Sequence, residues 1–152
     1  MFNRCWVWGI TLGAMLITQG ALAFPCFITI IKDNCWTHYT VTIDVLDADT
    51  QATLTTIVVP KGESWSRGRF DGQPKQHLMV RAKFKPIFWK ASVNKIYYAK
   101  HYWLLPDAGE GKTTAFNINI CYPKSFSSVP LPPEANSKCI CSEQNLPRVS
   151  DI

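Results

Sequence analysis

The stretch QHLMVRAKFK, residues 76–85, decides the fold class, because its apolar and polar side chains alternate with a period of two. One face carries the apolar side chains of Leu78, Val80, Ala82 and Phe84. The other face carries Met79, Arg81, Lys83 and Lys85. Successive side chains of a β-strand point to opposite faces of its sheet. The stretch therefore predicts a strand with one face in a hydrophobic core and a basic face toward solvent.

The same period recurs along most of the chain. YTVTIDVL (39–46) and ATLTTIVV (52–59) flank the turn-forming residues DADT, which predicts a β-hairpin. Further strand candidates are 26–32, 64–70, 96–105 and 113–121. With about seven short strands and no helical periodicity, we expect an all-β protein, a single antiparallel β-sandwich with an immunoglobulin-like layout. The cysteine spacing does not match an immunoglobulin domain, so this expectation concerns architecture only.

The two ends of the chain differ from its middle. Residues 1–23 combine a positive start, an apolar run and a small-residue site at Ala21 and Ala23, which is the pattern of a cleaved secretory signal peptide. We expect cleavage after Ala23, a β-sandwich domain over 24–122, and a periplasmic or secreted location. Residues 123–152 hold five of the ten prolines and predict an irregular, extended tail.

Five cysteines follow the expected cleavage site: Cys26, Cys35, Cys121, Cys139 and Cys141. In an oxidising compartment cysteines of this kind form disulfides. We expect Cys26–Cys35 across the first turn, and a bridge from Cys121 to Cys139 or Cys141 that ties the tail to the sandwich. An odd number leaves at least one thiol unpaired, which could join two chains in a disulfide-linked dimer.

Positive charge is concentrated in residues 61–100, which carry ten basic and two acidic side chains. Aromatic residues are interleaved with these basic side chains or follow them directly. Such a mixture suits an acidic protein surface, an anionic glycan or lipid headgroups, although lysines on a strand also occur simply as a solvated face. The exported location argues against nucleic acid. The expected binding residues are Arg81, Lys83, Lys85, Trp89, Lys90, Tyr97, Tyr98 and Trp103.

No set of residues predicts catalysis. His38, His77 and His101 do not have the spacing of metal ligands, and Cys139-x-Cys141 is better explained by a disulfide than by a metal site. The Gly-x-Ser-x-Gly motif of many hydrolases is absent. We therefore expect no enzyme activity, no metal and no cofactor; the alternative is a small secreted hydrolase whose site assembles from residues distant in sequence.

Three segments are similar to small, uncharacterised exported proteins of Legionella-type bacteria. They are FPCFITIIKDNCW (24–36), HYWLLPD (101–107) and NINICYPKSFSSVPLPP (117–133). The resemblance spans most of the chain after residue 23 and implies an exported or periplasmic protein; it brings no activity and no functional residues. The expected function is a non-enzymatic protein-interaction module, an envelope-associated or secretion-related accessory protein.

Overall fold

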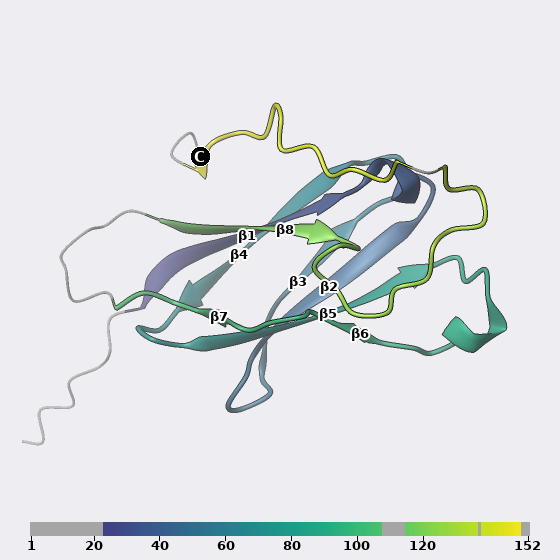
Figure 1. The fold of residues 1–152 in the computed structure, drawn as a ribbon. Coiled ribbons are helices and arrows are strands. Elements are labelled where there is room, and N and C mark those ends of the chain that lie inside the picture. The colour runs from purple at the N-terminus through teal and green to yellow at the C-terminus, as the bar shows by residue number, and fades with distance from the viewer. Residues whose placement is uncertain (1–22, 108–114, 137, 150–152) are drawn as a thin grey trace, which may run out of the picture.

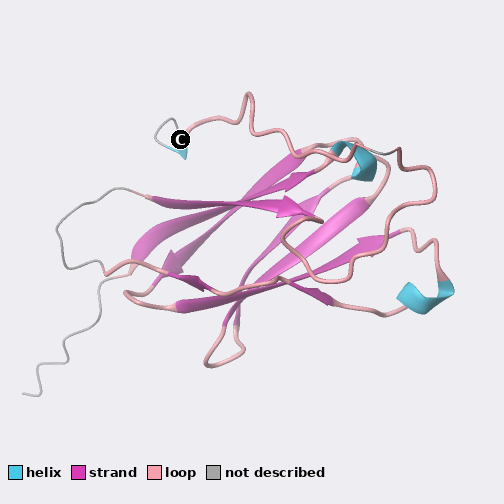
Figure 2. Cartoon of the chain, in the orientation of Figure 1, coloured by secondary structure: helices cyan, strands magenta, loops and turns pink. Residues whose placement is uncertain are grey.

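The computed structural model describes residues 23–107, 115–136 and 138–149, which are built mainly of β-strands (Figure 1 and Figure 2). The strands are β1 (Phe24–Lys32), β2 (Thr40–Asp47), β3 (Thr53–Val59), β4 (Trp65–Gly72), β5 (His77–Lys85), β6 (Tyr97–Tyr98), β7 (Trp103–Leu104) and β8 (Phe116–Tyr122). The helical elements are short 3-10 turns, η1 (Asn34–Trp36) and η2 (Lys90–Ser92). The predicted β class is therefore confirmed. Residues 1–22, most of the expected signal peptide, lie outside the described residues.

The strands form two sheets. One has the order β4-β1-β8, and the other has the order β3-β2-β5-β6, with β7 also paired to β5. The predicted hairpin is confirmed, since Val41 on β2 lies opposite Val59 on β3 in an antiparallel pair. The stretch 76–85 forms β5, which runs antiparallel to β2. Within the described residues, no helix has the length and apolar character needed to span a membrane.

Two details of the expected architecture are wrong, and a third is not confirmed. The pairing is not wholly antiparallel, because β1 and β8 run parallel. Periodicity cannot reveal this, since apolar alternation is the same in both orientations. The single strand expected over 96–105 is divided into β6 and β7. The strand orders also differ from the ABED and CFG sheets of a constant-type immunoglobulin domain, so an immunoglobulin-like layout is not supported.

The inner faces of the two sheets share one hydrophobic core. Ile28 and Ile30 of β1, Ile43 of β2, and Ile120 of β8 are all inaccessible to solvent and belong to one cluster. The apolar face predicted for β5 lies in the same core, as its period required. Complete burial of each such aliphatic side chain contributes about 1.5–3 kcal/mol, which makes this shared core the main stabilising feature of the fold.

An aromatic cluster closes one end of the core. Its centre is Trp36 of η1, which is fully buried. The Trp36 ring centroid lies 4.8 Å from that of Phe84 on β5 and 4.9 Å from that of Tyr122 on β8, both in edge-to-face contact. Tyr39 packs on it at 5.1 Å. Edge-to-face pairs add to the stabilisation from burial, so Trp36 joins the turn after β1 to one strand of each sheet.

The disulfides are Cys35–Cys139 and Cys121–Cys141. The expected tie between tail and domain is confirmed, with Cys141 as the partner of Cys121. The expected Cys26–Cys35 bridge is wrong. Cys26 lies near the start of β1, about 20 Å of extended chain from the end of that strand, and Cys35 lies beyond that end. Cys26 is a free thiol with no solvent exposure, so a disulfide to a second chain would first require its exposure.

Polar contacts join the tail to the η1 end of the molecule as well. Asn34 makes three hydrogen bonds to the tail. Its backbone amide donates to the Ile140 carbonyl at 3.3 Å, its Nδ2 donates to the Lys138 carbonyl at 2.9 Å, and the Ile140 amide donates to Asn34 Oδ1 at 2.6 Å. The Tyr39 hydroxyl donates to Glu134 Oε1 at 2.7 Å. Burial and the neighbouring Glu134 raise the pKa of Tyr39 to about 12. The tail is thus irregular in backbone conformation (Figure 1), and these hydrogen bonds and the two disulfides attach it at several points.

Lys32, at the end of β1, has a buried ammonium group. Its side chain crosses to the second sheet, where Nζ donates to the carbonyl oxygens of Tyr39 at 2.7 Å and Pro60 at 2.8 Å. Burial lowers the pKa of Lys32 to about 8, against a smaller opposing effect of the Glu63 carboxylate. The two carbonyls accept from two of the three N–H donors of the ammonium group and do not neutralise its charge, so the protonated form is costly in the folded protein.

We therefore expect Lys32 to make stability rise with pH. Its pKa in the folded state is below the unfolded value, so the folded state gains relative stability as pH rises through 8 and loses it as pH falls. Between pH 8 and 9 the gain relative to a Lys32→Met variant should be about 1 kcal/mol. Cys26 and Tyr39, whose pKa values are raised, act in the opposite sense at higher pH. Urea denaturation across pH 7–9 checks this; parallel curves for the two proteins would contradict it.

Candidate functional site

The outward face of β5 carries the three basic residues expected in the binding surface. Arg81 is already engaged, because its Nε lies 3.2 Å from Asp44 Oδ2 on β2, and both side chains are less than one third exposed. Lys83 and Lys85 are exposed and lie opposite threonines of β2. Neither makes an ion pair within the described residues. The available positive charge of β5 therefore belongs to the two lysines.

The connection between β5 and β6, residues 86–96, is here named the arm. It extends beyond the ends of these strands (Figure 1). Its first anchor is Phe88, which stacks on Phe84 with ring centroids 5.1 Å apart and lies 5.4 Å from Tyr39 and 6.0 Å from Trp36. The base of the arm is thus packed into the aromatic cluster.

A second anchor lies at the far end of the arm. Tyr97 is 3% exposed, stacks on Phe84 at 5.9 Å, and its hydroxyl is hydrogen-bonded to Ser92 Oγ at 3.1 Å. Ser92 is itself buried, and its amide donates to the Trp89 carbonyl within η2. The expectation that Tyr97 belongs to the binding surface is therefore wrong. As a member of β6 it points into the core, and its role is to hold the arm.

With its anchors turned inward, the arm presents large apolar side chains to solvent. Trp89 is 51% exposed and Val93 58%. Lysines alternate with them, and residues 81–100 contain six basic and no acidic residues. We call the following set the arm surface: Lys83, Lys85, Ile87, Trp89, Lys90, Val93, Lys95, Ile96 and Tyr98.

Five of the expected binding residues belong to this exposed set. Tyr98 lies opposite Arg81 in the sheet and shares its outward face, 47% exposed. Trp103 does not belong to this set. It lies on β7 opposite Leu78 of β5, is half-buried against the core, and its ring centroid lies 4.1 Å from that of His101. Of the expected residues, Lys83, Lys85, Trp89, Lys90 and Tyr98 are exposed members of the arm surface, and their role in binding stays a prediction.

Sequence reasoning missed the aliphatic members Ile87, Val93 and Ile96, as well as Lys95. Their exposure has no periodic signature, because the arm is irregular apart from the single turn η2. The absence of acidic residues over 81–100 was a readable signal that the basic region continues through the whole arm.

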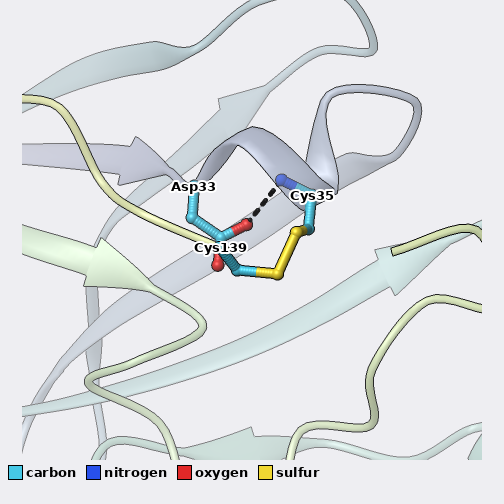
Figure 3. A group of neighbouring side chains, drawn as sticks. All are labelled: Asp33, Cys35 and Cys139. Carbon is cyan, nitrogen blue, oxygen red and sulfur yellow. Dashed lines mark hydrogen bonds between the residues drawn. A yellow bond between two sulfur atoms is a disulfide. The ribbon is translucent and has the colours of Figure 1, made fainter. Parts of the chain in front are cut away.

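Within the described residues, one group of side chains has donor atoms close enough together to hold a metal. It consists of Asp33, Cys35 and Cys139, whose donor atoms lie within 4.8 Å of one another (Figure 3). The two sulfur atoms are bonded to each other, which removes the thiolates a metal would need. Asp33 Oδ1 instead accepts the Cys35 amide at 3.0 Å and caps η1. Burial raises the pKa of Asp33. The group is best explained as a structural link.

His77 is the histidine whose surroundings come nearest to those of a catalytic residue. It lines an open depression of about 310 Å³ together with Ala48, Asp49 and Tyr102. No hydrogen bond joins His77 to Asp49 or Tyr102 among those of the described residues, and the depression offers no serine or cysteine nucleophile.

No family model, curated protein or solved structure matches the chain. A proposal of function therefore has to start from the chemistry of the arm surface.

We expect neighbouring residues of the arm to differ sharply in their effect on stability. Phe88→Ala removes an anchoring ring and should lower the free energy of unfolding by about 2–3 kcal/mol. Trp89→Ala removes an exposed ring and should lower it by less than about 1 kcal/mol. Denaturant titration of the two variants beside the wild type measures both. Equal losses, or a larger loss for Trp89→Ala, would mean that the arm is not anchored through Phe88.

Proposed function

We propose that this protein is an exported, non-enzymatic β-sandwich module that binds an acidic protein of the cell envelope through the arm surface. The observation that carries the proposal is the opposite orientation of neighbouring side chains. Phe88, Ser92 and Tyr97 are packed or hydrogen-bonded inward, while Trp89 and Val93 between them remain half exposed. Large apolar side chains exposed on an anchored connection are typical of a surface that binds another molecule.

The composition of the arm surface suits a partner with an apolar centre and an acidic rim. Aromatic residues such as Trp89 and Tyr98 are enriched at the buried centres of protein interfaces. The surrounding lysines would accelerate encounter with acidic groups and select the register of binding. An anchored arm loses little conformational entropy when it binds, which supports affinity from a small surface.

The expected location fits this proposal. Two disulfides are typical of proteins in an oxidising compartment, such as the periplasm or the extracellular space. The secretory pattern of residues 1–23 suggests the route to that compartment. We infer that this protein, as a monomer or within a larger assembly, has an accessory role and acts together with an envelope or secretion-related protein.

An anionic lipid surface is the second candidate. Trp89 and Tyr98 are amphipathic rings of the kind that gather at the headgroup level, and Lys85 and Lys90 flank Ile87 and Trp89 in the sequence. Anionic glycans share this electrostatic preference. The experiment below distinguishes lipid from protein.

The test is photo-crosslinking from position 89, with Trp89 replaced by a photoreactive phenylalanine analogue in the native host. A Lys83→Glu/Lys85→Glu/Lys90→Glu variant reverses the charge of the arm surface. Arg81 is left unchanged because a glutamate there would face Asp44. The matched control is Lys124→Glu/Lys138→Glu/Arg148→Glu, which reverses three exposed basic residues elsewhere that make no ion pair within the described residues.

We expect one protein adduct that persists in the control and falls at least about fivefold in the arm variant, since each reversed charge replaces attraction by repulsion. An equal yield in both variants would contradict the proposal. Cosedimentation with phosphatidylglycerol vesicles but not phosphatidylcholine vesicles, without a protein adduct, would instead establish the lipid candidate.

A further inference from the structure

A continuous chain of hydrogen bonds crosses the outer face of the β4-β1-β8 sheet, away from the arm surface. Arg67 of β4 begins it: Nη2 donates to the Pro147 carbonyl of the tail at 2.8 Å, and Nε donates to Thr29 Oγ1 of β1 at 2.8 Å. The Thr29 hydroxyl donates to Asn117 Oδ1 at 3.1 Å. Asn117 Nδ2 then donates to Asn119 Oδ1 at 2.9 Å. All three strands of the sheet contribute to the chain.

Between this face and the tail lies a groove of about 350 Å³. The sheet contributes Arg67, Asn117 and Asn119 to its walls, and the tail contributes Glu143, Leu146 and Arg148 among others. This volume is in the range of small-ligand sites, and few polar groups converging on a concave surface are typical of such sites.

The direction of the hydrogen bonds determines what the groove offers. Each member donates to the next, so the chain ends in the side-chain amide of Asn119, whose N–H donors have no partner within the described residues. Bonds in such a chain polarise one another and strengthen the last donor. The groove therefore presents donors toward the ligand, and its preferred ligand atom is an acceptor oxygen.

The charge of the groove favours an anion. Arg67 is held on three sides, because its guanidinium also lies 5.5 Å from the centroid of the Trp65 ring. It makes no ion pair within the described residues, and neither does Arg148. The residues lining the groove thus include two guanidinium groups and one carboxylate, that of Glu143. An ordered arginine without an anionic partner is a suitable group for binding a carboxylate.

We propose that this groove binds a small ligand through its carboxylate. The guanidinium of Arg67 and the amide of Asn119 donate to the carboxylate oxygens, and Leu146 contacts the apolar part of the ligand. The carboxylate can belong to a peptide carboxyl terminus or to a sugar acid. This site lies on the other sheet from the arm surface and does not depend on the proposed protein partner.

Attachment of the tail alone does not explain the arrangement. The bond from Arg67 to Pro147 already holds the tail, and it needs neither Asn117 nor Asn119. Both asparagines are exposed and lie on the edge strand β8, so their alignment adds little to tail attachment. Their alignment is accounted for by a ligand that accepts from Asn119.

The experiment is an NMR titration of the protein with N-acetyl-leucine and with glucuronate. N-acetyl-leucinamide and glucose are the matched uncharged probes. The signals followed are the side-chain amide of Asn119 and the Nε–H of Arg67. We expect saturable shifts with at least one acid and none with its uncharged counterpart; the acid that binds identifies a peptide-type or a sugar-type carboxylate.

Two variants make the assignment specific. Asn119→Ala should weaken binding about tenfold, the usual loss for one hydrogen bond to a charged group, while the backbone spectrum and the thermal midpoint stay unchanged. Glu143→Gln should tighten binding about twofold or more, because it removes the opposing charge. The absence of saturable shifts with both acids, equal binding of the uncharged probes, or full affinity in a folded Asn119→Ala variant would overturn the proposal.

Discussion

The packing around Trp36 is the interaction on which the placement of the arm and the tail depends. This fully buried ring contacts Tyr39, Phe84 and Tyr122 and so joins the turn after β1 to both sheets. Its indole N–H has no hydrogen-bond partner among the described residues, which costs free energy on burial. Burial of the large ring and its contacts with four aromatic neighbours offset this cost.

The same cluster positions both parts of the molecule that lie outside the sheets. The arm is packed on it through Phe88, and the tail is bonded to its edge through Cys35 and Tyr39. In the chain-entropy account, a bridge closing a loop as long as that of Cys35–Cys139 contributes about 5 kcal/mol. One rigid end of the fold thereby supports a basic surface on one sheet, while the tail borders a polar groove on the other.

The sequence predicts the strands where apolar and polar side chains alternate. It does not predict features that depend on the path of the chain between the strands. Alternation identified β2, β3 and β5, because one buried face per strand leaves a period of two. It could not show that β8 runs parallel to β1, or that Cys35 pairs with a cysteine more than one hundred residues away. Those facts depend on how the connections cross the ends of the sheets.

The same distinction separates the residues of the candidate site that could be predicted from those that could not. The basic face of β5 was readable, because strand period assigns Lys83 and Lys85 to one side. Tyr97 and Tyr98 could not be assigned, since a two-residue strand gives no pattern to show which ring turns inward. The pairing of Arg81 with Asp44 depends on the register between β5 and β2, which no local pattern specifies.

The central claim is that the aromatic cluster holds the arm in one conformation, and amide hydrogen exchange tests it most directly. In the wild type, we expect slow exchange at Ser92 and Val93, whose amides donate within the arm, and at Ile140, whose amide donates to Asn34. In a Trp36→Leu variant these amides should exchange rapidly together, while those of the β2–β3 hairpin remain protected. Rapid exchange at Ser92 and Val93 in the wild type, or no change in the variant, would contradict the account.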